Sequence, residues 1–109
     1  MATAYKVLGQ SYPTAATATT LYTVPSATQA VVSTINVCNQ SASADIIRIA
    51  IRPAGATLTA SQYIVYNGSV IANGIFCMTA GVTLATTDVI TVYSTNGTSS
   101  FSAFGSEIS

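Results

Sequence analysis

Two runs of β-branched residues, separated by a short polar break, constrain the fold of this chain more than any other feature. They span residues 30–39 (AVVSTINVCN) and 46–53 (IIRIAIRP), with QSASAD between them. Successive side chains of a strand point to opposite faces, so Ile47, Ile49 and Ile51 share one face of the second run. The pattern predicts a half-buried strand with these isoleucines in the core, joined to the first run as a β-hairpin or across a corner.

In the first run the odd-numbered positions are the better candidates for the core. These positions are Val31, Ser33, Ile35 and Val37. They alternate with a more polar even-numbered face, which is the pattern of a second half-buried strand. Neither run contains a catalytic constellation, so the best-defined stretch of the chain describes architecture.

Further short runs rich in β-branched and aromatic residues follow, with glycine, proline and asparagine between them. We count about eight strands at roughly 8–14-residue spacing and no helical periodicity, which is typical of a sandwich or small barrel. The expected fold is an all-β, antiparallel β-sandwich of jelly-roll or Ig-like type, in one domain over residues 1–109. Asn96-Gly97 is expected to join the last two strands as a hairpin, and Asn67-Gly68 is a second strong turn signal.

The N-terminal segment, residues 1–20, is poor in large apolar side chains and rich in Ala, Thr and Ser. Such a segment cannot bury enough apolar surface to order by itself. Residues 4–8 alternate weakly and end at Gly9, which predicts either a short first strand or an extended arm. We favour an arm that orders against a partner, with Tyr5, Val7 and Leu8 as its anchors. Deletion of residues 1–10 is then expected to leave the sandwich folded and to weaken assembly.

Charged residues are scarce: half of the 109 residues are hydrophobic, three are basic, three are acidic, and the formal net charge is zero. Ordinary soluble domains carry about a quarter charged residues. A weakly charged surface rich in Ala, Thr and Val favours association with neighbours. We therefore expect a homo-oligomer, with a trimer as one form, or many copies on a lattice. The alternative is a monomer kept soluble by its Ser, Thr, Asn and Gln side chains.

Nucleic acid is not an expected partner, because its binding requires clustered basic residues and only Lys6, Arg48 and Arg52 are basic. No apolar run approaches the ~18–20 residues of a membrane-spanning helix, and the N-terminus lacks the pattern of a signal peptide. We therefore expect no membrane partner and synthesis in a cytoplasm. In that compartment Cys38 and Cys77 are expected to be reduced.

The chain has no histidine, which removes the commonest general base and the Ser-His and Cys-His arrangements. Its three acids are Asp45, Asp88 and Glu107. Asp45 and Asp88 each stand directly before an apolar run, where a short acid ends a turn and hydrogen-bonds nearby backbone. This interpretation is favoured over a catalytic carboxylate pair. We predict no catalytic residues, no metal site and no cofactor, and hence a protein that is not an enzyme.

Two of the three basic residues, Arg48 and Arg52, share the non-core face of one predicted strand. Their placement suggests polar contacts with a neighbouring subunit, together with Tyr5, Val7 and Leu8 of the arm. The alternative is that these arginines only keep a strand edge soluble.

The aromatic residues raise the alternative of a sugar-stacking platform. Strand alternation places Tyr63 with Val65 on one side and Ile64 with Tyr66 on the other. At most one of the two tyrosines could then join any platform. Packing in a core or an interface is therefore favoured over sugar binding.

The chain resembles a group of small β-sandwich virion proteins encoded by tailed bacteriophages, cyanophages in particular. The similar segments are AYKVLGQ, TTLYTVP, VVSTINVCN, RIAIRPAGATL, QYIVYNG, TTDVITVY and FSAFGSE. The resemblance implies a structural protein present in many copies in the virion, most simply a decoration or cement protein bound to the major capsid protein. A component of the tail, baseplate or fibre, or a module that binds carbohydrate or a host surface, is the alternative. The resemblance carries over no catalytic residue, and Cys38 and Cys77 depart from its pattern.

Overall fold

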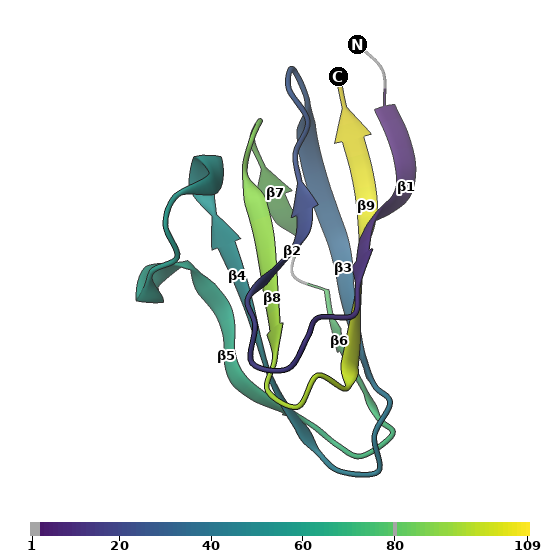
Figure 1. Ribbon diagram of the computed structural model, residues 1–109. Helices are drawn as coiled ribbons and strands as arrows, with labels where there is room; N and C mark the ends of the chain where they lie inside the picture. The colour runs from purple at the N-terminus through teal and green to yellow at the C-terminus, as the bar shows by residue number, and fades with distance from the viewer. Residues whose placement is uncertain (1–2, 80) are drawn as a thin grey trace.

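The computed structural model describes residues 3–79 and 81–109, which form nine β-strands and two short 3₁₀ turns. The strands are β1 (Thr3–Ser11), β2 (Thr19–Thr23), β3 (Gln29–Asn39), β4 (Asp45–Arg52), β5 (Tyr63–Val70), β6 (Ile75–Met78), β7 (Val82–Leu84), β8 (Val89–Ser94) and β9 (Ser99–Ile108), and the turns are η1 (Pro53–Gly55) and η2 (Ala60–Gln62). Two antiparallel sheets pack face to face (Figure 1). The predicted all-β sandwich is confirmed, with nine strands in place of about eight.

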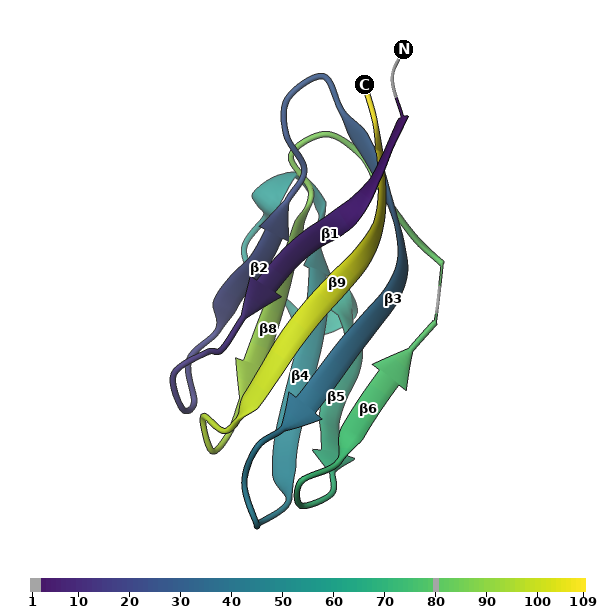
Figure 2. The same cartoon turned by 90° about the vertical axis from the view of Figure 1, so that its right-hand side faces the viewer.

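The strands pair in a nested order. β1 pairs with β9, β2 with β8, β3 with β6 and β7, and β4 with β5, all antiparallel. These pairs alternate between the sheets, giving the order β1-β9-β3-β6, with β7 also on β3, in one sheet and β2-β8-β4-β5 in the other (Figure 2). Nested pairs that alternate between two sheets form a jelly roll. Of the two sandwich types expected, the structure has the jelly roll.

The connections after β3 and after β8 both cross from one sheet to the other. The two central β-branched runs are therefore joined across a corner and do not form a hairpin. The hairpin predicted at Asn96-Gly97 is wrong for the same reason, because β8 and β9 lie in different sheets. Asn67-Gly68 lies within β5 and is not a turn between strands.

The core confirms the alternation predicted for β4. Ile47 and Ile49 are fully buried, whereas Ile51 is half-buried and packs against the edge of the same cluster. Burying an isoleucine side chain contributes about 1.5–3 kcal/mol relative to leaving it exposed. The middle of this strand is therefore a principal source of the sandwich's stability.

A β-bulge in β3 overturns half of the predicted core pattern of that strand. The register against β9 shifts between Val32 and Thr34, which leaves Ser33 as the additional residue. Val31, a predicted core residue, is 36% exposed, whereas Val32 is buried. Ser33, also predicted for the core, is exposed and donates from its hydroxyl to the carbonyl of Phe104 at 3.1 Å. Beyond the bulge the odd positions point inward as predicted, and both of them are buried: Ile35 and Val37.

Of the two structures predicted for the N-terminal segment, the first strand is confirmed and the arm is wrong, because β1 is an edge strand paired with β9 from Thr3 to Ser11. A bulge at Leu8 turns that side chain into the core, where it is 9% exposed. Gly9 allows β1 to approach β2, because a Cβ atom at this position would overlap the carbonyl oxygen of Leu21. The partner against which this segment orders is the chain's own C-terminal strand.

Candidate functional site

The outer face of the β1-β9-β3-β6 sheet carries no Lys, Arg, Asp or Glu side chain among the described residues. Residues directly opposite each other in antiparallel strands share a face, so the register defines its composition. We call this surface the uncharged face. It consists of five cross-strand rows: Thr3, Ile108 and Gln29; Tyr5, Ser106, Val31 and Thr83; Val7, Phe104 and Thr34; Gln10, Ser102, Asn36 and Cys77; and Ser100, Cys38 and Ile75.

The two ionised residues of this sheet, Lys6 and Glu107, point to its other side. Their side chains form an ion pair of 2.9 Å, and Glu107 also accepts a hydrogen bond from the hydroxyl of Tyr22 on β2 of the opposite sheet. The hydrogen bond from Tyr22, and then that from Lys6, lowers the pKa of Glu107. Burial, followed by the hydrogen bond to Glu107 and its charge, raises the pKa of Tyr22. This cluster joins the two sheets. It also holds the Lys6 and Glu107 side chains on the side of the sheet that is opposite to the uncharged face.

The structure divides the predicted interface residues among three places. Tyr5 and Val7 lie on the uncharged face, where they are 85% and 49% exposed. Leu8 belongs to the core. Arg48 and Arg52 lie on β4, on the outer face of the opposite sheet. The five residues therefore do not form one surface.

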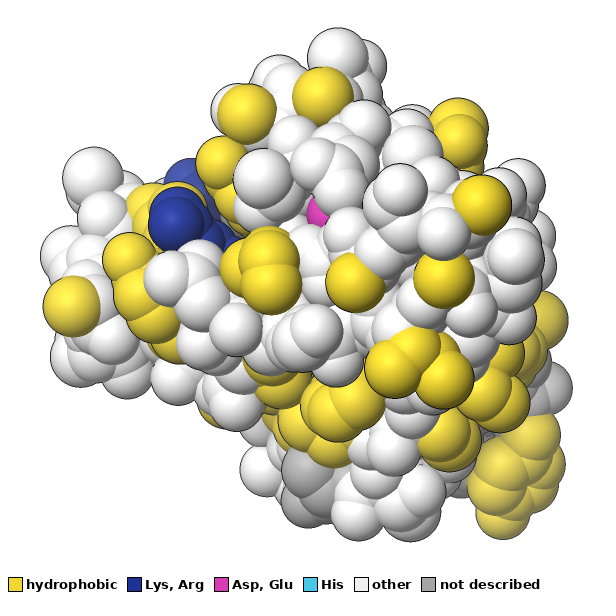
Figure 3. Space-filling view, turned by 90° about the horizontal axis from the view of Figure 1, so that it is seen from below, with side chains coloured by type: hydrophobic (Ala, Val, Ile, Leu, Met, Phe, Trp, Pro, Cys, Tyr) yellow, Lys and Arg dark blue, Asp and Glu magenta, His cyan; other side chains and the backbone are white. Residues whose placement is uncertain are grey.

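Arg48 is held between two tyrosines. Its guanidinium carbon lies 4.6 Å from the ring centroid of Tyr66 on β5 and 4.6 Å from that of Tyr93 on β8. Its Nε donates to the side-chain oxygen of Asn67 at 2.8 Å. Figure 3 shows Lys or Arg side-chain atoms in dark blue on the face seen from below, beside hydrophobic side chains. The contacts with two rings, from strands on either side of β4, and the hydrogen bond through Nε restrain the guanidinium.

A pair of register shifts in β5 brings the tyrosines to one face. The register against β4 shifts between Tyr63 and Val65 and again between Val65 and Gly68, so Ile64 is an additional residue and both Tyr66 and Asn67 stand opposite Arg48. Asn67 has a positive φ of 55°, as a bulge can require.

The rings of Tyr63 and Tyr66 consequently meet edge to face, with centroids 4.9 Å apart. The prediction that these two residues point to opposite sides is wrong. Regular alternation, on which that prediction depended, does not survive the bulge at Ile64.

An open hollow of about 520 Å³ adjoins this pair. It is lined by Leu58, Thr59, Ala60, Tyr63 and Tyr66, and we call it the tyrosine hollow. Thr59 and Gln62 form a capping box at η2, which fixes the backbone along one side of the hollow. We define the tyrosine–arginine cluster as Arg48, Tyr63, Tyr66, Asn67 and Tyr93.

Arg52 lies on the same face of β4 but is bonded to its own chain. Its Nε donates to the carbonyl of Ala56 at 2.8 Å and its Nη2 to that of Gly55 at 3.0 Å. A longer hydrogen bond of 3.4 Å reaches the hydroxyl of Thr91. Arg52 therefore stabilises the η1 loop, whereas Arg48 is bonded through one nitrogen only.

Asp45 is fully buried at the start of β4. Its carboxylate accepts hydrogen bonds from the hydroxyls of Ser94 and Ser99 and from the backbone N–H groups of Ile46 and Asn96. Burial is the largest single influence on the group and raises the pKa of Asp45, but the four hydrogen bonds together outweigh it and hold the pKa below its usual value. These contacts tie two loops together, in agreement with the predicted structural role.

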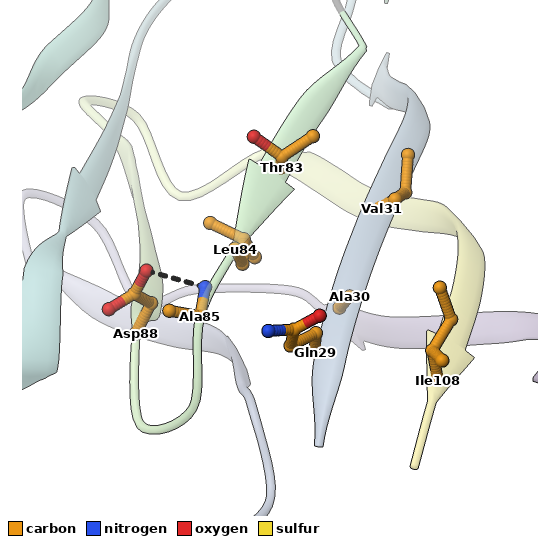
Figure 4. Close-up of a pocket in the computed structure, with 8 residues that line it drawn as sticks. All are labelled: Gln29, Ala30, Val31, Thr83, Leu84, Ala85, Asp88 and Ile108. Carbon is orange, nitrogen blue, oxygen red and sulfur yellow. Dashed lines mark hydrogen bonds between the residues drawn. The ribbon is translucent and has the colours of Figure 1, made fainter. Parts of the chain in front are cut away.

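Asp88 lines a second hollow, of about 420 Å³, between β3, β7 and the end of β9 (Figure 4). One of its carboxylate oxygens accepts from the N–H of Ala85 at 2.9 Å and the other from that of Ala54 at 2.8 Å. Both oxygens are thus bonded to backbone at a turn, as the sequence predicts. Asp88 is the one carboxylate among the lining residues, so this hollow holds no carboxylate pair.

Among residues 3–79 and 81–109, no group of three or more His, Cys, Asp or Glu side chains is placed to hold a metal ion. Cys38 and Cys77 carry free thiols. Within the same residues, no helix has the length and apolar character that crossing a bilayer requires.

Comparison of the chain with protein-family models, with curated proteins and with solved structures gives no match.

Proposed function

We propose that the protein is a non-enzymatic structural subunit of a tailed-phage virion, present in many copies and associating through the uncharged face. The observation that carries the proposal is the absence of charged side chains from that face among the described residues, while Tyr5 and Val7 project from it. Interfaces between proteins are depleted in charge at their centres and enriched in aromatic residues. An exposed sheet face with these properties is suited to a neighbouring subunit.

Two further points support this role. The jelly roll occurs in viral capsid proteins and in lectins, although a fold by itself does not decide function. The other point is the resemblance to small virion proteins that we infer from the sequence segments named above. Head decoration or cementing, with the major capsid protein as partner, is the proposed location, and a tail, baseplate or fibre component is the alternative. Such a protein would be assembled in the host cytoplasm and reside in the virion, without nucleic acid or membrane as a partner.

The proposal is tested on particles of the phage that carries the gene. Cryo-electron microscopy should locate many symmetry-related copies on the head. Particles formed with a Val7→Lys variant should lose the protein, because the substitution places a charge in the uncharged face. Ile64→Lys is the matched control, since Ile64 is 43% exposed against 49% for Val7 and lies in the other sheet. Purified particles without the protein contradict the proposal, whereas copies on the tail favour the alternative location.

Sugar binding is the second candidate function. The observation that favours it is the contact between Tyr63 and Tyr66 beside an open hollow, which the sequence pattern did not predict. Aromatic side chains with a few polar groups are the usual lining of small-molecule sites. A binding assay against a panel of oligosaccharides tests this function independently of assembly.

A further inference from the structure

We propose that the tyrosine hollow binds a sugar ring that carries a carboxylate, and that Arg48 holds this carboxylate. The inference rests on the second candidate function and specifies its ligand class. Neutral sugars and carboxylates without a sugar ring are the competing ligands, and the experiment below separates them.

The first argument is that Arg48 presents a fixed group. Its guanidinium carbon lies over the rings of both Tyr66 and Tyr93, 4.6 Å from each centroid, and Asn67 accepts from Nε at 2.8 Å. A side chain already held in one conformation loses little further freedom when it binds a ligand. The stacked guanidinium is therefore pre-organised.

The second argument is that the terminal nitrogens of Arg48 are available. Within the described residues Arg48 makes one hydrogen bond, through Nε, so its Nη atoms have no protein acceptor. No buried side-chain nitrogen or oxygen in the described part of the chain lacks a hydrogen-bond partner. The Nη atoms must then reach solvent, where they can donate to an incoming group.

The third argument is charge. The one ion pair found among the described residues joins Lys6 to Glu107, so no carboxylate neutralises Arg48. The two Nη groups of an arginine match the two oxygens of a carboxylate in a bidentate hydrogen bond. Polyanions such as nucleic acid require several clustered basic residues, whereas a single fixed arginine is suited to a single carboxylate.

The fourth argument is the lining of the adjoining hollow. Its volume of about 520 Å³ lies within the roughly 300–1,000 Å³ of typical small-molecule sites. The rings of Tyr63 and Tyr66 offer apolar surface, and the Thr59 hydroxyl and the tyrosine hydroxyls offer hydrogen bonds. A pyranose has an apolar C–H face and a rim of hydroxyls, so it is complementary to this mixed lining. Tyr66 contacts both Arg48 and the hollow, which places charge recognition beside ring recognition.

The inference is tested by isothermal titration calorimetry with oligogalacturonate, its methyl ester, the neutral galacto-oligosaccharide of the same linkage, and acetate. Oligogalacturonate should bind about tenfold or more tighter than the ester and the neutral sugar, because a charge-assisted hydrogen bond contributes that much. Acetate should bind more weakly than any of the sugars. The ester removes the ligand's charge while the protein is unchanged, so this comparison does not depend on the folding of a variant.

Two arginine variants then assign the charge contact. Arg48→Gln should abolish the preference for oligogalacturonate over its ester, whereas Arg52→Gln, two positions along the same face, should retain it. Equal binding of acidic and neutral sugars overturns the inference and leaves sugar binding intact. If no sugar binds, both this inference and the candidate function of sugar binding are overturned. If acetate binds as tightly as oligogalacturonate, the ligand is a carboxylate without a sugar ring, and the inference is overturned.

Discussion

Asp45 accepts a hydrogen bond from the hydroxyl of Ser99 although the two residues lie in different sheets of the sandwich. Ser94, on β8 beside Asp45's own strand, donates to the same carboxylate oxygen. All three side chains are fully buried. One carboxylate therefore holds β4, β8 and β9 together at the end where the chain crosses between the sheets.

Replacement Asp45→Asn is expected to lower the free energy of unfolding by about 1–3 kcal/mol at neutral pH, because a buried group loses charge-assisted hydrogen bonds. Urea unfolding measures the change. Asp88→Asn is the control, since its contacts are to backbone at an exposed turn. An Asp45→Asn protein as stable as the wild type would show that the network does not support the fold.

The same carboxylate predicts a pH dependence. The pKa of Asp45 lies below its usual value of 3.8 in the folded protein, so its contribution is present above that pH and is lost as the pH falls through the folded-state pKa. Below about pH 4, the Asp45→Asn variant should lose less unfolding free energy than the wild type as the pH falls. Glu107, whose pKa is also lowered, should account for part of the acid sensitivity that the variant retains. Since the chain has no histidine, stability should be nearly flat from about pH 5.5 to 8. A strong slope in that range, or an Asp45→Asn variant with the acid sensitivity of the wild type, would contradict this assignment.

Ile49→Ala is expected to cost about 2–5 kcal/mol of unfolding free energy, because it opens a cavity at a fully buried position. Ile64→Ala, at a bulge where the side chain is 43% exposed, should cost about 0.5 kcal/mol or less. Thermal and urea unfolding of both variants provide the comparison. Similar losses in the two variants would contradict the assignment of the core.

Removal of residues 1–11 is expected to destabilise the fold severely, because it deletes β1, exposes the edge of β9 and removes Leu8 from the core. The loss of Leu8 alone should cost about 2–5 kcal/mol. Circular dichroism and urea unfolding test this against a control lacking only residues 1–2, which retains β1. A truncated protein with wild-type stability would restore the interpretation of this segment as a separate arm.

Alternation was a sound guide wherever a strand is regular. It predicted the buried Ile47 and Ile49 and the shared outer face of Arg48 and Arg52. It failed in β3 and β5, because each strand has one additional residue, Ser33 or Ile64. The residues that precede it in the strand then point to the opposite face from the one that regular alternation predicts. Neither position carries a glycine or proline, the usual sequence signals of such irregularity.

The candidate site could be predicted only in part for the same reason. The scarcity of basic residues drew attention to Arg48, but the sequence did not show that Tyr66 and Tyr93 enclose it, since these residues come from two different neighbouring strands. The Asn67-Gly68 pair was a sequence signal that we assigned to a turn, whereas in the structure Asn67 adopts its positive φ at a bulge. An Asn-Gly pair favours such backbone at a bulge as well as in a turn.

Sedimentation equilibrium on the purified protein tests most directly the central claim that the uncharged face is an assembly surface. The wild type and the Ile64→Lys control should sediment as oligomers at micromolar concentration, and Val7→Lys should sediment as a folded monomer. A monomeric wild type at high concentration, or a Val7→Lys variant with the mass of the wild-type oligomer, would contradict the claim.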